Sequence, residues 1–304
     1  MKVLVNGLPF FSQKLVRDLN EFDSENSYVF YDTYSSKLEQ IKFALALPTA
    51  GAVISSNGVT DRSKSLDLTL KFKKKLIMQW HGTDVKHAVD HYHDKTIDRK
   101  YIDAAKHLVS APWFVDELKE VIRSVEYAPF GYINEYGKGE EYTKIKVLSY
   151  FAKGRENFYG WKEIESAARK FPDLEFTIVG SEGEGLTAPN NVSFLGWISE
   201  DELFELMCKH AIFLRLTEHD GKAISVSQAL GAGCEVVWTY AMDNCHQVTK
   251  GDEDLIRKID ELINLLKNRG LTPNKTNIAF AKETLNRKEV MTNFVAKLKG
   301  LLNE

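Results

Sequence analysis

Cysteine is scarce in this chain of 304 residues, which contains only Cys208, Cys234 and Cys245. A disulfide framework takes cysteines in pairs, so an odd number in a long chain does not suit one. Few, unpaired cysteines are typical of proteins kept in a reducing compartment. We therefore expect free thiols and a reducing environment for this protein.

Long hydrophobic runs are missing as well. The longest apolar stretch is the 12 residues 43–54, and Pro48 and Gly51 interrupt it, whereas a membrane-spanning helix needs about 20 apolar residues. The first residues, 1–7, lead directly into a predicted buried strand, without the hydrophobic region of a signal peptide. We expect a soluble, cytoplasmic protein, and contact with the cytosolic face of a membrane stays open.

Charge of one sign does not accumulate in either half. The chain has 40 Lys+Arg against 43 Asp+Glu, and 19 against 20 of these lie in residues 1–143. A basic half that could hold nucleic acid is therefore absent, and we expect no nucleic-acid partner. The composition, 43% hydrophobic and 27% charged, is that of an ordinary globular protein and excludes wholesale disorder.

What the sequence does contain is a regular alternation of short apolar strands and amphipathic helices. Such an alternation is typical of a parallel sheet covered by helices on both faces. Strands are expected at residues 3–5, 28–31, 52–55, 76–80, 107–111 and 125–128 in the first half, and at 146–150, 175–179, 192–195, 212–216 and 235–239 in the second. Helices are expected at 12–19, 162–170, 201–209, 224–230, 252–267 and 288–302, with Ser199 and Glu202 as a start signal for the third.

The alternation is interrupted once, at the polar, glycine-containing residues 134–141. This is the best linker candidate, because domain boundaries fall in such segments. It divides the chain into a domain at 1–138 and a domain at 139–304, and the length suits two domains. The sequence therefore predicts an α/β protein with two Rossmann-like domains facing across a cleft, with the site at the carboxyl ends of the strands.

The richest candidate segment runs from Thr217 to Gly233, between a predicted strand and a helix. Asp220 and Gly221 favour a turn, after which the backbone N–H groups of Ile224 and Ser225 open the helix and can bind an anion. Gln228 follows two turns later, where its amide can hydrogen-bond a polyol. Taken alone, the segment is more typical of an ordinary strand–helix turn with an aspartate cap, because such segments are common.

This segment resembles a known family. Asp220-Gly221 followed by Gln228-Ala229-Leu230-Gly231-Ala232-Gly233 is similar to the acidic-x7-acidic motif of GT-B retaining glycosyltransferases of family four. The resemblance implies that Asp220 contacts the donor sugar, that the amides of Ile224 and Ser225 hold the diphosphate, and that Gln228 binds the ribose. Two residues depart from the motif: aspartate replaces the commoner glutamate, and Gln228 replaces the second glutamate and carries no charge.

Two further segments of the second half fall where that family places donor contacts. Lys153 and Arg155 follow a predicted strand, and the resemblance implies that they offset the charge of the donor diphosphate. Gly196 and Trp197 lie in a segment similar to one whose backbone contacts the nucleobase. The plain alternatives are a solvated basic loop for the first segment and an edge strand with a core tryptophan for the second.

In the first half, His81-Gly82-Thr83-Asp84 follows a predicted buried strand. An imidazole there can donate a hydrogen bond or exchange a proton near neutral pH. The segment matches the His-Gly-x-Asp of the family, which implies that His81 faces the donor and that Asp84 lies on the acceptor side. Gly7, in the first strand–helix turn, is the other acceptor-side candidate.

The resemblance implies transfer of a hexose from a nucleotide-diphosphate sugar to a sugar, lipid-linked or small-molecule acceptor, with retention and without metal or cofactor. Two alternatives remain: a catalytically silent protein that binds a sugar nucleotide or a protein partner, and a nucleotide-sugar epimerase with the same fold. His87, His91 and His93 suggest a metal cluster, but a solvated helix face is the better interpretation. The basic residues 71–75 are expected to be solvated, or to touch anionic lipid if the acceptor is membrane-bound.

Overall fold

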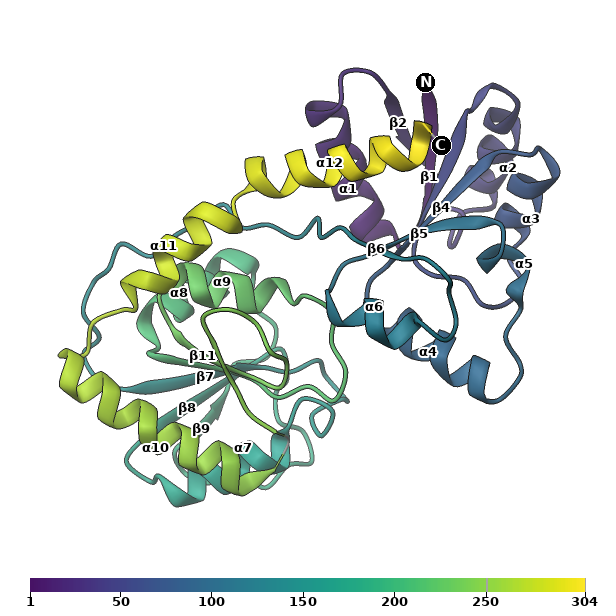
Figure 1. Ribbon diagram of the computed structural model, residues 1–304. Coiled ribbons are helices and arrows are strands. Elements are labelled where there is room, and N and C mark those ends of the chain that lie inside the picture. Colours follow the sequence, from purple (N-terminus) through teal and green to yellow (C-terminus); the bar gives the residue numbers. More distant parts are fainter. Residues whose placement is uncertain (250, 304) are drawn as a thin grey trace. The chain divides into compact units, whose positions relative to one another are not determined.

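The computed structural model describes residues 1–249 and 251–303, and the chain folds into two compact units (Figure 1). The first unit consists of Met1–Gly131, His219–Lys222 and the C-terminal residues from Lys288 onward. The second unit consists of Tyr132–Glu218 and Ala223–Arg287. Two parallel sheets with surrounding helices, one in each unit, give the predicted α/β fold.

The division between the units falls after Gly131 rather than at residue 138. The N–H of Ile133 donates to the carbonyl of Leu285, and the N–H of Gly137 donates to the carbonyl of Gly231. The segment expected as a linker is therefore hydrogen-bonded along the second unit. Its polar side chains suggested a free connection, but its backbone groups have partners that only the tertiary structure supplies.

The first unit is built on a six-stranded parallel sheet with the order β2-β1-β3-β4-β5-β6. From β1 the chain continues to β2 on one side of the sheet, and from β3 it continues to β4 on the other side, so the switch point lies between β1 and β3. The carboxyl ends of the strands at such a switch point usually form a crevice. The strands are β1 (Lys2–Gly7), β2 (Ser27–Phe30), β3 (Ala52–Ser56), β4 (Lys75–Trp80), β5 (Ala105–Val109) and β6 (Glu126–Tyr127).

Helices connect these strands and bury one apolar stripe each against the sheet. Phe43, Leu66 and Phe114, from three of the helices, pack in one cluster with Leu4 and Val53 of the sheet, and burying such side chains is the main favourable term in folding. The helices are α1 (Pro9–Phe22), α2 (Lys37–Ala46), α3 (Lys64–Lys71), α4 (Thr83–His93), α5 (Arg99–Ile102) and α6 (Trp113–Leu118), with a 3-10 turn at Leu47–Thr49.

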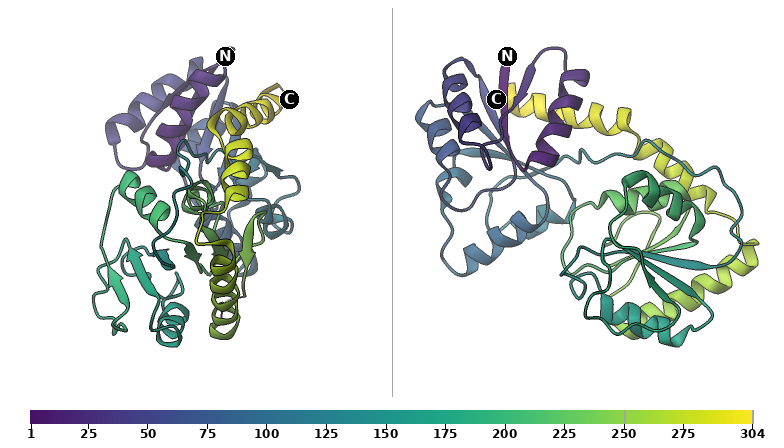
Figure 2. Two further views of the ribbon diagram at one scale, coloured as in Figure 1. Left: turned by 90° about the vertical axis from the view of Figure 1, so that its left-hand side faces the viewer. Right: turned by 180° about the vertical axis from the view of Figure 1, so that it is seen from behind.

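The last helix, α12 (Arg287–Asn303), belongs to the first unit from Lys288 onward and lies beside α1 (Figures 1 and 2). Phe294 packs edge-on against Phe130, with 5.8 Å between the ring centroids. Lys299 forms ion pairs with Asp23 at 3.1 Å and Glu25 at 2.9 Å, just after the end of α1. The C-terminal helix is thus held by both apolar and ionic contacts.

Asp23 makes the stability of this unit depend on pH. Burial alone would raise the pKa of Asp23, but hydrogen bonds from Asn26, Tyr28, Glu25 and Lys299 lower it from 3.8 to about 2. A lowered folded-state pKa adds stability above pH 3.8 that is lost as the pH falls toward 2, about 2 kcal/mol in total. Urea unfolding at pH 5 and pH 3 is expected to show about half of that loss.

Asp23→Asn should remove this part of the acid sensitivity. The matched control is Glu25→Gln, which deletes the other ion pair of Lys299 but leaves the Asp23 carboxyl in place. An equal loss of stability between pH 5 and pH 3 in wild type and Asp23→Asn would show that another group titrates instead.

The second unit repeats the plan with the order β12-β11-β10-β7-β8-β9. Here the switch point lies between β7 and β10, which are paired in parallel. The strands are β7 (Lys146–Tyr150), β8 (Glu175–Val179), β9 (Val192–Phe194), β10 (Ile212–Arg215), β11 (Glu235–Trp238) and β12 (Cys245–Gln247).

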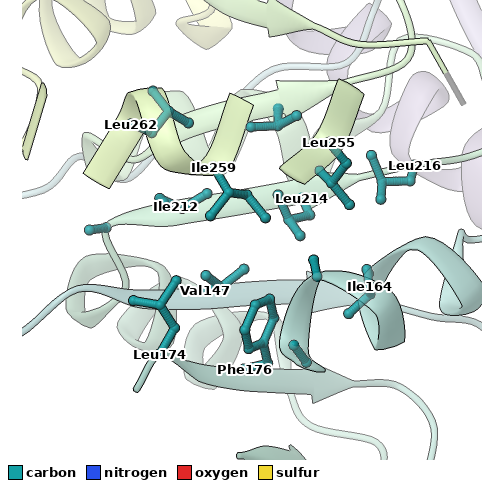
Figure 3. Close-up of a cluster of buried hydrophobic side chains, with 14 of the residues drawn as sticks. Val147, Ile164, Leu174, Phe176, Ile212, Leu214, Leu216, Leu255, Ile259 and Leu262 are labelled. Atoms are coloured by element: carbon teal, nitrogen blue, oxygen red, sulfur yellow. The ribbon is translucent and has the colours of Figure 1, made fainter. Parts of the chain in front are cut away.

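Amphipathic helices cover this second sheet. In α10 (Asp252–Arg269), Leu255, Ile259 and Leu262 recur at helical spacing and face the buried side chains of β7 and β10 (Figure 3). The other helices are α7 (Trp161–Lys170), α8 (Glu200–Lys209), α9 (Ile224–Ala232) and α11 (Lys275–Thr284). The start signal at α8 is confirmed: Ser199 and Glu202 form a capping box.

Candidate functional site

The carboxyl edge of the second sheet gathers most of the donor-side residues predicted from the sequence. Because every pairing in this sheet is parallel, the loops that follow β7, β8, β9 and β10 all leave from the same edge. Lys153 and Arg155 come from the first of these loops, Gly196 and Trp197 from the third, and Ile224, Ser225 and Gln228 from the helix after the fourth.

The loop after β7 exposes its two cations. Lys153 forms an exposed ion pair with Glu184 at 3.3 Å, and the guanidinium of Arg155 lies 4.0 Å from the centre of the Phe158 ring. Glu156 holds the loop, since its Oε1 accepts from the N–H of Gly154 at 3.0 Å and from Ser181 Oγ at 2.8 Å. Burial alone would raise the pKa of Glu156, but these hydrogen bonds lower it.

The loops after β8 and β9 approach each other through glycine. The N–H of Gly180 donates to the carbonyl of Gly196 at 2.6 Å, and Gly180 has φ +85°, where a Cβ would lie 2.1 Å from the carbonyl oxygen of Phe151. Beside Gly196, the side chain of Trp197 is 83% exposed. The alternative of a core tryptophan at this position is therefore wrong, and the indole offers a flat apolar surface to solvent.

Helix α9 begins without a side-chain cap. Its N-cap residue is Ala223, and its first turn contains no acidic residue. The first N–H groups of an α-helix have no intrahelical partner, and together with the helix dipole they favour an anion. Ile224 and Ser225 therefore present amides at the edge of the sheet where an anion can bind.

Gln228 is 8% exposed and holds a carboxylate from another element. Its Nε2 donates to Oε1 of Glu200 at 2.8 Å. Glu200 is the first residue of α8 and lies exposed on the surface. An acidic group therefore stands beside Gln228, although the sequence motif lacks its second acid. The resemblance could not reveal Glu200, because the two residues are 28 positions apart.

Arg215 is a second residue that the sequence interpretation missed. It ends β10 at the switch point, is 8% exposed, and has its guanidinium 4.9 Å from the centre of the Tyr159 ring and 5.7 Å from that of Tyr150. A charged residue inside the apolar run 212–216 was the available signal, since charged side chains are rarely buried without a partner. It adds a buried cation at the switch point.

In the first unit, His81 follows β4 and is held on three sides. Its ring stacks on Phe11 with 4.7 Å between centroids, meets the edge of Phe130 at 5.2 Å, and its Nε2 lies 3.1 Å from Ser56 Oγ. Burial lowers the pKa of His81, and the nearby Asp84 carboxylate only partly opposes this. The imidazole is therefore neutral at pH 7, with a fixed orientation.

Asp84 positions the turn that carries His81. Its Oδ1 accepts from the N–H groups of Gly82 at 2.7 Å and Val85 at 3.0 Å, and its Oδ2 accepts from the N–H of Gly58 at 2.7 Å. The N–H of His81 lies 3.1 Å from Oδ1. The carboxylate is thus occupied by backbone donors, which makes Asp84 a positioning residue in this structure. Gly7 has φ +109°, and a Cβ there would lie 2.7 Å from the backbone nitrogen of Ser56.

Asp220 and Gly221 belong to the first unit with His219 and Lys222. Trp113 Nε1 donates to the carbonyl of Asp220 at 2.8 Å, and His219 Nε2 lies 2.9 Å from the carboxylate of Glu117. A Cβ at Gly221 would lie 2.1 Å from the carbonyl oxygen of His81. The backbone of Gly221, the residue after Asp220, therefore packs against the backbone of His81.

Lys222 was not predicted from the sequence, although it lies within the motif. Its Nζ donates to the hydroxyl of Tyr127 at 3.4 Å. Burial lowers the pKa of Lys222 and raises that of Tyr127 to about 12. The ammonium group of Lys222 therefore loses its proton more readily than that of a surface lysine. In its charged form it adds a cation to the segment that contains Asp220.

Gly221→Ala is expected to destabilise the first unit by about 1–3 kcal/mol, because the added methyl group overlaps the His81 carbonyl and displaces the residues on both sides. The measurement is the thermal midpoint of unfolding. Gly300→Ala in α12 is the matched control, since a Cβ there meets no atom within 4 Å. A Gly221→Ala variant as stable as the wild type would contradict the close packing on His81.

The histidine pattern of α4 does not form a metal site. Within residues 1–249 and 251–303, no group of three or more His, Cys, Asp or Glu side chains is placed to hold a metal ion. His87 and His91 stack with 6.2 Å between their rings, and His91 Nδ1 lies 2.8 Å from Thr60 Oγ1. Across the same described residues, none of the helices is long and apolar enough to cross a bilayer.

No protein-family model matches the sequence, and no curated protein sequence matches it. Solved structures do match. Sucrose-phosphate synthase from Thermosynechococcus elongatus has a TM-score of 0.71 at 9% identity, covering 100% of this chain and 99% of that one. The lipopolysaccharide outer core galactosyltransferase WaaB, in its apo form, has a TM-score of 0.68 at 14% identity, covering 99% of each chain.

The pneumococcal O-GlcNAc transferase GtfA, solved with UDP and GlcNAc, has a TM-score of 0.59 at 11% identity and is matched over 88% of this chain. This chain spans only 61% of that protein. At such low identity the matches show the fold, which is the GT-B fold that the sequence resemblance implied. They leave the reaction to be argued from the residues.

Proposed function

We propose that this GT-B protein is a glycosyltransferase that moves a hexose from a nucleotide-diphosphate sugar to an acceptor hydroxyl, with retention and without metal, as in family four. The observation that carries the proposal is the edge of the second sheet at its switch point. There Lys153 and Arg155 follow β7, and the uncapped N-terminus of α9 follows β10. A diphosphate needs such cations and amides to offset its charge.

On the donor side, each part of a sugar nucleotide has a group to bind it. The diphosphate binds the amides of Ile224 and Ser225 and the cations Lys153 and Arg155. Lys153 then exchanges its exposed ion pair with Glu184 for the diphosphate. The base lies against the backbone of Gly196 and the exposed indole of Trp197, since aromatic rings stack on bases. The ribose hydroxyls bind the Glu200 carboxylate that Gln228 orients.

For the reaction itself, the resemblance to family four assigns Asp220 to the donor sugar and neutral His81 to a reacting hydroxyl. The leaving diphosphate is stabilised electrostatically, so no covalent catalyst is needed. The acceptor is bound by the first unit. Because protein cations balance the diphosphate, transfer is expected to continue in EDTA.

Calorimetry with UDP-, GDP- and ADP-sugars tests the donor site. One of the donors is expected to bind with a Kd below about 1 mM, and Arg155→Gln is expected to weaken it about tenfold because a bidentate contact to phosphate is lost. Arg169→Gln, which removes an exposed arginine of α7 paired with Glu165, is the matched control. Failure of every donor to bind at millimolar concentration would contradict the proposal.

A second candidate function rests on Gln228, which stands where the motif has an acid. A catalytically silent protein would bind a sugar nucleotide and transfer nothing. Turnover separates the two functions, since donor binding without transfer to any acceptor in a broad panel would favour the silent protein. Analysis of products formed without acceptor separates an epimerase, which would release an isomerised sugar nucleotide.

A further inference from the structure

The first unit contains a cavity of about 750 Å³ that no part of the proposed donor site uses. It lies at the carboxyl ends of β1 and β3, with residues of α2 on one wall and residues of α3 on the other. These two strands flank the switch point of the first sheet, which is where open α/β sheets bind ligands. The volume suits a ligand the size of a sugar or sugar phosphate.

The lining of the cavity is basic. Its charged residues are three cations, Lys37, Arg62 and Lys64, and a single acid, Asp61. None of the three cations forms an ion pair with another of the described residues. Cations without partners around a concave surface favour a ligand with a negative group, and the fork of arginine suits a phosphate.

The floor of the cavity is polar and incompletely hydrogen-bonded. Asn6 is 2% exposed; its Nδ2 donates to Ser65 Oγ at 3.1 Å, and its Oδ1 has no partner among the described residues. A buried acceptor without a donor is costly, and polar groups of this kind suit a ligand with hydroxyl groups. Asn57, beside it, donates to the hydroxyl of Tyr34 at 2.9 Å.

The cavity and His81 both lie at the carboxyl edge of the first sheet. Ser55 and Asn57 line the cavity, and the residue between them, Ser56, has its Oγ 3.1 Å from His81 Nε2. Because successive side chains of a strand point to opposite faces of the sheet, Ser56 and His81 lie on the face opposite to the cavity floor. The cavity is therefore a site separate from the histidine.

We propose that this cavity binds a phosphorylated polyol, with Lys37, Arg62 and Lys64 around the phosphate and the amides of Asn6 and Asn57 facing the hydroxyl groups. That this ligand is the acceptor rests on the proposed function; the binding itself does not. The phosphate has two sources, a free sugar phosphate or a lipid headgroup. Leu38, Ile41 and Leu45 form an exposed stripe along α2, so both sources are tested.

The test is calorimetry of the full chain with hexose 6-phosphates, hexose 1-phosphates and myo-inositol 1-phosphate, each against its unphosphorylated parent. At least one phosphorylated ligand is expected to bind at least tenfold tighter than its parent. Arg62→Gln with Lys64→Gln should weaken this binding at least tenfold. Lys71→Gln with Lys74→Gln, which removes equal charge outside the cavity lining, should leave the affinity unchanged.

Ile41→Trp gives a second variant that keeps every charge. Ile41 lines the cavity and is 58% exposed, so the larger side chain narrows the cavity without entering the core, and binding should again fall about tenfold. A parallel arm measures sedimentation with vesicles of phosphatidylcholine, with and without phosphatidylinositol. Binding only to the inositol-lipid vesicles, lost in Arg62→Gln/Lys64→Gln, supports the proposal with a headgroup as ligand.

Equal affinity for phosphorylated and parent compounds, equal binding by the two double variants, or no binding in either arm would overturn the proposal. The donor titration is run on the same samples. Donor binding without polyol-phosphate binding overturns the cavity proposal alone, whereas polyol-phosphate binding without any donor binding overturns only the proposed function.

Discussion

Replacing His81 by phenylalanine is expected to lower kcat by about 100-fold or more while changing the donor Kd less than about threefold. Phenylalanine keeps the ring that stacks on Phe11 and meets Phe130, so the fold around it is retained. What is lost are the two ring nitrogens. A positioned acid, base or hydrogen-bond donor at a reacting group typically contributes 10²–10⁴-fold to the rate.

The pH dependence gives a readout that a merely structural role would not change. Because burial lowers the pKa of His81, the neutral imidazole persists below pH 6.5, and wild-type kcat should fall only when the pH drops further and the ring becomes charged. His81→Phe should lose this acidic limb. The measurement is kcat as a function of pH between 5 and 8 for both proteins.

His91→Asn is the matched control for this variant. His91 also bonds a hydroxyl, that of Thr60 at 2.8 Å, but it lies in α4 and outside the candidate site. The kcat of Ser56→Ala should lie between those of His81→Phe and His91→Asn, because this substitution removes the hydroxyl beside His81 Nε2 and leaves the imidazole ring less firmly oriented. Full activity of His81→Phe would exclude His81 from the reaction.

The elements of the fold were largely predictable because each one bears its own local signal. The strands β7 and β8 were expected at 146–150 and 175–179 and lie at Lys146–Tyr150 and Glu175–Val179, since both are short apolar runs ended by polar or glycine residues. Helix α11 and strand β12 were not expected. Lys275–Thr284 has an alanine-rich but weakly amphipathic sequence, and Cys245–Gln247 is only three residues long.

The site was harder to predict, because its decisive contacts join distant residues. The motif located Asp220 and Gly221, but only the structure shows that Gly221 packs on the carbonyl of His81, 140 positions earlier. Asp84 was expected on the acceptor side, and the structure shows its carboxylate bonded to backbone N–H groups. No periodicity or spacing encodes such partners, since they depend on which loops share a sheet edge.

Glu200 and Gln228 show what such a partner can do to a motif. The motif of the family ends in an acid, which here is Gln228, and an aligned sequence would register the loss of a charge. The structure places the carboxylate of Glu200 2.8 Å from Nε2 of that glutamine. One negative charge, from α8, and one amide, from α9, are therefore present at this position.

Exchanging the two residues tests whether the pair acts as a ribose ligand. Glu200→Gln removes the only carboxylate of the pair and is expected to weaken donor binding about 30-fold, about 2 kcal/mol for a hydrogen bond to a charged group. Gln228→Glu alone sets two carboxylates against each other, which raises their pKa values and should weaken binding as well. The double variant Glu200→Gln/Gln228→Glu restores one charge and one amide, so its affinity should return to within about threefold of wild type.

The ligand supplies the second half of the experiment. A 2′-deoxyribose donor lacks the 2′-hydroxyl group. With this donor, Glu200→Gln should lower the affinity less than about threefold, so that the effects of the substitution and of the missing hydroxyl are strongly non-additive. Asp201→Asn, an exposed acid one residue along α8, is the control for a general effect of negative charge. Restoration by the double variant together with the small effect on the 2′-deoxyribose donor would show a contact between the pair and the ribose, since a purely structural role of the pair would not depend on that hydroxyl. If the double variant binds as weakly as the singles, or if Glu200→Gln binds like wild type, the carboxylate of Glu200 has no part in donor recognition and the loss of the acid at Gln228 is uncompensated.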